Sequence, residues 1–164
     1  MPRPNRIDGF PNLVTLFFTR AEAGGDQPFL WRKTEREWTP LSWREVAHRV
    51  SALADSLLEM GLTAGDRVVL VSENRPEWFI ADLGIMAAGC VTVPTYTTNT
   101  ERDHQHILDN SGARAVIVST AKLARTLLPA AMRAQVEHVI VMEDLRTAQQ
   151  SDTRIIHWDR LINE

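Results

Sequence analysis

The chain has 164 residues, of which 44% are hydrophobic, and a formal net charge of −3. This length suits a single domain, and this hydrophobic content supports a buried core and excludes a disordered tail. The slightly acidic balance, with no stretch that gathers Lys and Arg on one face, argues against a nucleic-acid partner.

The amino-terminal part predicts a lead-in and a helix. Residues 1–9 are polar, contain two prolines and lack the apolar stretch of a signal peptide, so we expect a flexible segment there. Asn12 can cap the helix that follows, because its side chain accepts a free backbone N–H, and consecutive glycines at 24–25 end that helix.

A β-hairpin is expected next. Residues 29–32 and 37–41 are strand-like and flank a short polar turn. Trp31 and Trp38 can pair across this turn, or both can pack inward on the core. The sequence leaves these two arrangements open.

A capping box marks the start of the next helix. The Ser42 hydroxyl can accept a free backbone N–H, while the Glu45 side chain reaches back to the start of the helix. Apolar residues then recur at helical spacing until Gly61, which suits the left-handed conformation that ends many helices.

Strand-like and helix-like segments alternate evenly in the remainder of the chain. The apolar runs begin near Arg67, Cys90, Arg114 and Glu137. The helical patterns between them cover residues 76–88, 101–110 and 121–133. This alternation predicts an α/β fold, with a mostly parallel sheet and right-handed crossovers. Because the runs are apolar throughout, helices should cover both faces of the sheet.

The last part of the sequence has weaker signals. Residues 143–153 form a polar connection, residues 155–158 can form a short strand, and residues 159–164 begin a helical pattern. Nowhere does the chain reach the roughly 18 consecutive apolar residues that a membrane-spanning helix needs. We therefore expect a cytoplasmic protein, with peripheral membrane association as a further option.

The sequence contains few features of a phosphate-binding or catalytic site. The junction at residues 72–76 has no glycine and places a carboxylate where a phosphate would lie, and the junction at 94–100 has neither glycine nor lysine. Neither is a phosphate-binding loop. No Gly-x-Ser-x-Gly elbow is present. The single cysteine, Cys90, lies in an apolar run and is expected to be buried and inert.

His104 and His106 could suggest a metal site. Residues i and i+2 of a helix point apart, so these two side chains cannot both face one ion. We expect them on a solvated polar face, with Ile107 and Leu108 turned inward, and we predict no metal ligand.

One loop is kept as a candidate site. Thr95, Tyr96, Thr97 and Thr98 follow the carboxyl end of an expected parallel strand, where open α/β sheets bind ligands. Their hydroxyls could hydrogen-bond a substrate or a partner. The alternative is an ordinary turn that ends at Thr100, a helix cap.

Five segments carry a family resemblance. They resemble the patterns L-T/S-Y-x-E-L, G-x-x-x-G-D-x-V, x-x-N-x-x-E-W/F, A-G-A-x-x-V-P and I-L-x-D-S-G-A-K. In that order they lie at residues 41–46, 61–68, 72–78, 88–94 and 107–114. Together they resemble the N-terminal portion of AMP-forming acyl-CoA synthetases, in the adenylate-forming superfamily that includes luciferases. The loop at residues 94–98 is most similar to the long-chain fatty-acyl branch.

The resemblance implies a part of a larger fold with several subdomains. Residues 10–164 would be an incomplete N-terminal α/β subdomain of a long-chain fatty-acid–CoA ligase. The whole enzyme would use ATP, CoA and Mg²⁺ to turn a fatty acid into acyl-CoA, through an acyl-adenylate. The family's phosphate loop and catalytic lysine are not in this sequence. The resemblance therefore assigns no catalytic, cofactor or metal residue here, and we expect a fragment that binds no cofactor and is inactive alone.

Two other classes of function remain open. The chain could be a standalone α/β binding module that lacks the catalytic machinery, with affinity for ATP or acyl-CoA. It could also be an oligomerisation module that uses the Trp-rich hairpin. A fragment with an uncovered apolar face would form a homo-oligomer or a swapped dimer.

Overall fold

The computed structural model describes residues 9–143 and 154–162. The chain divides into two compact units, Met1–His48 and Arg49–Glu164. Its helices are α1 (Leu13–Gly24), α2 (Trp43–Glu59), α3 (Pro76–Ala87), α4 (Glu101–Ser111), α5 (Ala121–Arg133) and α6 (Asp159–Ile162). Its strands are β1 (Pro28–Lys33), β2 (Trp38–Ser42), β3 (Arg67–Val71), β4 (Val91–Thr95), β5 (Ala115–Val118), β6 (His138–Val141) and β7 (Arg154–His157).

The first unit contains α1 and the hairpin of β1 and β2. The Asn12 side chain accepts a hydrogen bond of 2.8 Å from the Thr15 backbone N–H, as expected for the cap of α1. An aromatic cluster lies after this helix, where the Phe29 and Trp43 rings stack with centroids 3.6 Å apart. Gly24 lies against the Trp43 ring so closely that a Cβ atom there would overlap it.

The hairpin corrects both arrangements expected for its tryptophans. β1 and β2 are antiparallel, with Trp31 opposite Pro40 and Trp38 opposite Lys33, so the two indoles are not direct cross-strand partners. Both are exposed, by 50% and 60% respectively. The expectation that they pack inward is therefore wrong. The Lys33 ammonium lies 5.9 Å from the Trp38 ring centroid.

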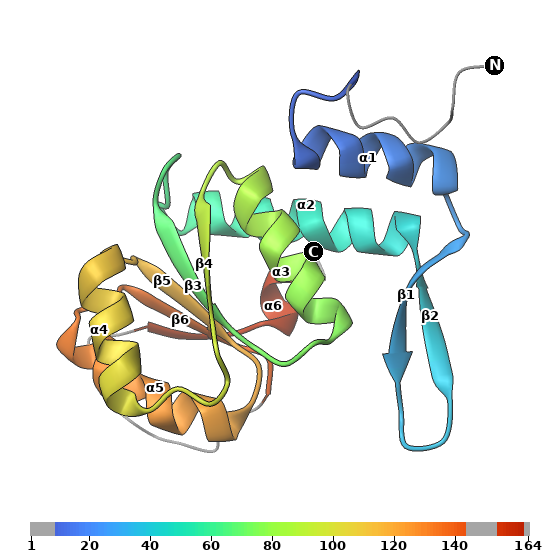
Figure 1. Ribbon diagram of the computed structural model, residues 1–164. Coiled ribbons are helices and arrows are strands. Elements are labelled where there is room, and N and C mark those ends of the chain that lie inside the picture. The colour runs from blue at the N-terminus through green and yellow to red at the C-terminus, as the bar shows by residue number, and fades with distance from the viewer. Residues whose placement is uncertain (1–8, 144–153, 163–164) are drawn as a thin grey trace. The chain divides into compact units, whose positions relative to one another are not determined.

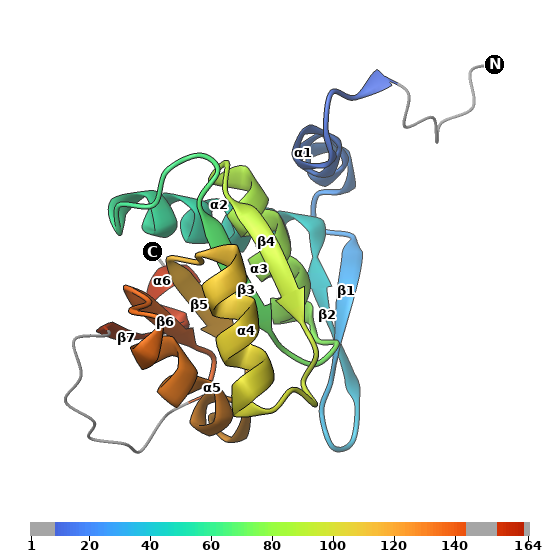
Figure 2. The ribbon, with the colours of Figure 1, turned by 60° about the vertical axis from the view of Figure 1, so that its left-hand side comes forward.

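The second unit is built on a five-stranded parallel sheet in the order β4-β3-β5-β6-β7. The connection from β3 to β4 runs in one direction, and the connection from β4 to β5 returns past β3. Right-handed crossovers then place α3 on one face and α4 and α5 on the other. Figures 1 and 2 show this arrangement, which confirms the predicted fold class.

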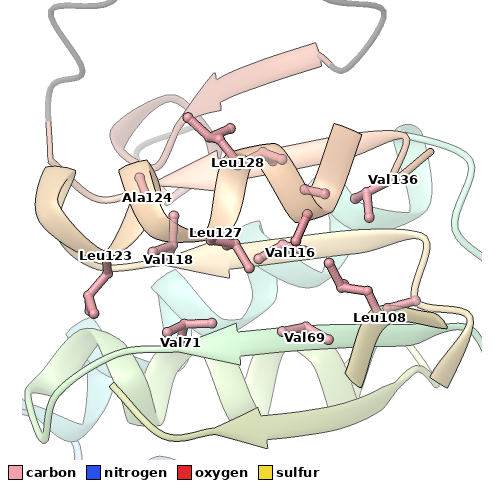
Figure 3. Packing of buried hydrophobic residues seen from close by; sticks show 14 of the residues in the cluster. Val69, Val71, Leu108, Val116, Val118, Leu123, Ala124, Leu127, Leu128 and Val136 are labelled. Atoms are coloured by element: carbon pink, nitrogen blue, oxygen red, sulfur yellow. The ribbon is translucent and has the colours of Figure 1, made fainter. Parts of the chain in front are cut away.

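The core below α4 and α5 is aliphatic. Alternate strand residues reach this face, among them Val69, Val71, Val116 and Val118, and they pack against Leu108 of α4 and against α5 (Figure 3). The strand residues between them point to the opposite face, which α3 covers (Figure 1). Helices thus shield both faces from solvent, which explains why these strand sequences do not alternate between apolar and polar residues.

Element boundaries differ little from the expectations. β7 covers residues 154–157 instead of 155–158, and α6 is observed over residues 159–162. The expected lead-in at 1–9 and the polar connection at 143–153 lie almost wholly outside the described residues.

Candidate functional site

The strand order creates a natural ligand position at the carboxyl edge of the sheet. β3 continues through α3 on one face, while its neighbour β5 continues through α5 on the other. Their carboxyl ends therefore lie at a topological switch point, the position where open α/β sheets leave a crevice. The loops after β3, β4 and β5 all begin at this edge.

A serine and a glutamate meet at the switch point. The Ser119 hydroxyl, which is fully buried, donates a hydrogen bond of 2.5 Å to the Glu73 carboxylate. The Ser119 backbone N–H also binds the Val71 carbonyl at 3.0 Å, so the loop after β5 is attached to the end of β3. A carboxylate at this position would repel a phosphate, so the absence of a phosphate loop at this junction stays a prediction.

The predicted loop after β4 lies at the same edge. Thr95 is the last residue of β4, and its hydroxyl oxygen is buried without a hydrogen-bond partner within the described ranges. Tyr96 is 79% exposed, and its carbonyl accepts a bond of 3.3 Å from the Asn99 N–H. Thr97 and Thr98 form the turn between them. The four residues thus present one large exposed ring and several hydroxyls, but no charge.

Thr100 ends this loop and caps α4. Its hydroxyl accepts a bond from the Asp103 N–H at 3.4 Å, and the Asp103 carboxylate accepts one from the Thr100 N–H at 2.9 Å. This is a complete capping box, and the bonds from Thr100 hold the pKa of Asp103 below its usual range. The expected helix cap is confirmed, whereas the role of the loop in binding stays a prediction.

The two histidines of α4 behave differently from each other. His106 is exposed, as expected, but His104 is only 1% exposed, so the expectation of a solvated face is wrong for it. His104 is buried because it lies one turn before the inward-facing Leu108, a spacing that places both on one helix face. Burial lowers the pKa of His104, which favours the neutral imidazole.

Cys90 is buried, as predicted. Desolvation raises the pKa of its thiol, with a smaller contribution from the Asp66 carboxylate. The protonated thiol is a poor nucleophile, so Cys90 is a core residue. Among the residues that the structure describes, no group of three or more His, Cys, Asp or Glu side chains could hold a metal ion.

The amino edge of the sheet carries a charged network with a structural role. The Arg114 guanidinium binds the Asp66 and Glu137 carboxylates, each at 2.7 Å, and the Gly61 carbonyl at 3.0 Å. The bond from Arg114 lowers the pKa of Glu137, while the pKa of Asp66 is lowered first by the Thr63 backbone N–H and then by Arg114. Arg114 therefore links the segments that precede β3, β5 and β6.

Sequence reasoning missed Ser119 and the contact that it makes. The only sequence feature that could have identified Ser119 is its position directly after the apolar run of β5. Glu73 was noticed only as an obstacle to phosphate. The structure brings both to the edge at which Thr95 lies. Arg75, in the same loop as Glu73, binds the Glu77 carboxylate at 2.8 Å.

The fold and the carboxyl edge of the sheet together define a class of protein. In this class, helices cover both faces of a parallel sheet, and the loops lie at a topological switch point. The sequence profile of the family described as AMP-binding enzyme matches residues 17–160. The chain belongs to this AMP-binding enzyme family.

Known proteins give the same result. A long-chain-fatty-acid–CoA ligase of Mycobacterium tuberculosis is 33% identical over 120 residues, covering 73% of this chain and 20% of the relative. One of Salmonella typhimurium is 33% identical over 142 residues, covering 86% of this chain and 24% of the relative. The chain therefore spans only about a fifth to a quarter of the length of these relatives.

Solved structures support the fold. The adenylation domain of a carboxylate reductase from Mycobacterium chelonae superposes with a TM-score of 0.83 at 17% identity, over 99% of this chain and 29% of that one. Acetoacetyl-CoA synthetase from Streptomyces lividans gives a TM-score of 0.77 at 22% identity, over 93% of this chain and 25% of that one. At these identities the likeness shows a shared fold.

Proposed function

We propose that this chain is the N-terminal portion of a long-chain fatty-acid–CoA ligase. The observation that carries the proposal is its 33% identity to such ligases over most of its length. In the proposed reaction the fatty-acid carboxylate attacks ATP, pyrophosphate leaves, and the CoA thiol then displaces AMP from the acyl-adenylate. Mg²⁺ would neutralise phosphate charge in the first step.

The described residues do not fit a nucleotide or Mg²⁺ site of their own. Glu73 occupies the switch point, and the loop after β4 has neither a glycine nor a lysine to hold a phosphate. We therefore assign ATP, CoA and Mg²⁺ to the full-length ligase, and propose that this chain alone binds no cofactor and is inactive. Its contribution would be a rigid layer that supports the loop of Thr95, Tyr96, Thr97 and Thr98 beside the substrate.

The test begins with the size of the native protein. An antibody against this chain should detect a band several times heavier than 18.5 kDa in lysate of the source cells. That full-length protein should form AMP and acyl-CoA from ATP, CoA and a long-chain fatty acid, and this chain alone should form neither. A native band at 18.5 kDa would contradict the proposal and favour a standalone binding module, for which calorimetric titration with ATP and acyl-CoA is the next measurement.

A second candidate function is oligomerisation. The observation that favours it is the exposure of Trp31 and Trp38 on the hairpin. If the chain forms a homo-oligomer or swapped dimer through these residues, changing both to Ser should dissociate it. Light scattering after size exclusion would then give a lower molar mass. A monomer at micromolar concentration would exclude this function.

We also propose a cytoplasmic location with peripheral membrane association. Each helix within residues 9–143 and 154–162 is too short or too polar to cross a bilayer. Fractionation of source cells tests the proposal, since a peripheral protein should leave the membrane pellet in high salt or at alkaline pH.

A further inference from the structure

His104 is an unusual residue for its position. It is 1% exposed, and neither of its ring nitrogens has a hydrogen-bond partner among the described residues. A buried polar group without a partner is unfavourable, and its protonated form is far more so. An aliphatic side chain would satisfy the helix pattern at this position.

The direction of α4 places His104 near the candidate loop. α4 starts at the end of that loop, and the chain reaches the amino edge after it, where the Arg114 N–H binds the Arg67 carbonyl at 3.1 Å. Leu108 lies one turn after His104 on the same helix face and packs in the cluster that includes Val69 (Figure 3). His104 therefore lies one turn closer to the carboxyl edge than Leu108.

The charged groups around His104 do little to stabilise its protonated imidazolium form. On α4 itself, the neighbouring Asp103 carboxylate favours the charged imidazole, but burial outweighs it and the pKa of His104 falls below its usual value. From α5, Arg133 reaches α4, where it binds Glu101 at 2.6 Å and Gln105 at 2.8 Å. The strand residues in the core below α4 and α5 are aliphatic.

We propose that His104 makes α4 and the loop before it, residues 96–100, sensitive to mild acid. The neutral imidazole is compatible with burial, whereas the imidazolium is stable only when the first turns of α4 leave the sheet and expose it to water. A proton taken from solvent below about pH 6.5 thus favours a locally open state, in which the loop that follows β4 loses its anchor. This inference goes beyond the proposed ligase function and does not depend on it.

The sign follows from linkage. The pKa of His104 is lower in the closed state than in the open state, where it is close to 6.5, so the open state binds more protons as the pH falls below that value. Between pH 7.5 and pH 5.5 the opening equilibrium should rise by about three- to tenfold. The protection of backbone amides in residues 96–108 against hydrogen exchange, corrected for intrinsic rates, should fall by the same factor.

The test compares matched variants of this chain by hydrogen exchange. His104→Leu should remove the acid-dependent loss of protection, and the control His106→Leu, on the exposed face of the same helix, should retain it. If His104→Leu retains the loss, or if His106→Leu removes it, the proposal is overturned. Titration of the His104 ring in the unaltered chain by NMR gives a reading that needs no variant. A midpoint at or above 6.5 would also overturn the proposal.

Discussion

At the scale of single residues, Arg114 does more than any other described side chain to join distant segments. It holds Asp66, Glu137 and the Gly61 carbonyl through four hydrogen bonds of 2.7 to 3.0 Å, and its side chain is only 32% exposed. The planar guanidinium suits this task, because it can bind one carboxylate through two nitrogens while it reaches a second. Bonds to both carboxylates raise the pKa of Arg114, so it keeps its charge at all accessible pH values.

We expect Arg114→Ala to destabilise the chain by about 2 kcal/mol, because two carboxylates and a carbonyl lose a charged partner. Arg133→Ala is the matched control. Its guanidinium binds Glu101 at the surface, where it is 53% exposed, and the loss should stay below about 1 kcal/mol. Urea unfolding at pH 7 measures both. Equal losses would show that the amino-edge network adds nothing beyond an ordinary surface ion pair.

Gly84 is a second residue with a definite steric role. A Cβ atom there would lie 2.6 Å from the Leu53 Cδ2 atom, so α2 and α3 approach closely at this point. Gly84→Ala should cost about 1 to 3 kcal/mol through overpacking. The double change Gly84→Ala with Leu53→Ala should cost less than the sum of the two single changes, since the new methyl group enters the space that Leu53 leaves. Additive losses in urea unfolding would contradict the close approach.

At the scale of elements, the capping box of α4 joins the candidate loop to the helix. Thr100→Ala should cost about 1 kcal/mol, because it removes the side-chain acceptor for the Asp103 N–H. Thr120→Ala is the control, since Thr120 caps α5 with one bond of 3.2 Å to the Leu123 N–H. Both variants should lose similar stability, but only Thr100→Ala should raise hydrogen exchange in residues 96–104. Unchanged hydrogen exchange in residues 96–104 would show that the order of the loop does not depend on the helix cap.

The same scale shows how much the sequence could predict. The alternation of apolar runs and helical patterns, together with caps such as Asn12 and Thr100, predicted the order of helices and strands, because these signals are local. The neighbours in the sheet are set by tertiary packing, and β3 lies beside β5 although β4 comes between them in the chain. The contact of Ser119 with Glu73 depends on that order and could not be predicted. The buried His104 was missed because its polarity was weighed above its position on the helix.

At the scale of the whole molecule, stability should depend on acid in two separate steps. The first, which begins below about pH 6.5, belongs to His104, whose pKa is lowered by burial. The second belongs to carboxylates whose pKa is lowered by hydrogen bonds, namely Asp66, Asp103 and Glu137. Each of these carboxylates contributes stability that is fully present above its unfolded pKa of about 4 and is lost as the pH falls through its lower folded value.

The two steps can be separated with two variants, by measuring the urea midpoint of unfolding from pH 8 to pH 2.5. His104→Leu should remove the decline that begins below about pH 6.5 and keep the decline below about pH 4. Arg114→Ala should keep the first decline and weaken the second, because without the guanidinium the pKa of Glu137 returns toward its usual range and that of Asp66 rises in part. Asp66 retains its bond from the Thr63 N–H at 2.8 Å, so a reduced acid step should persist in Arg114→Ala. If the lower step is unchanged in Arg114→Ala, the acid stability resides in groups other than the amino-edge network.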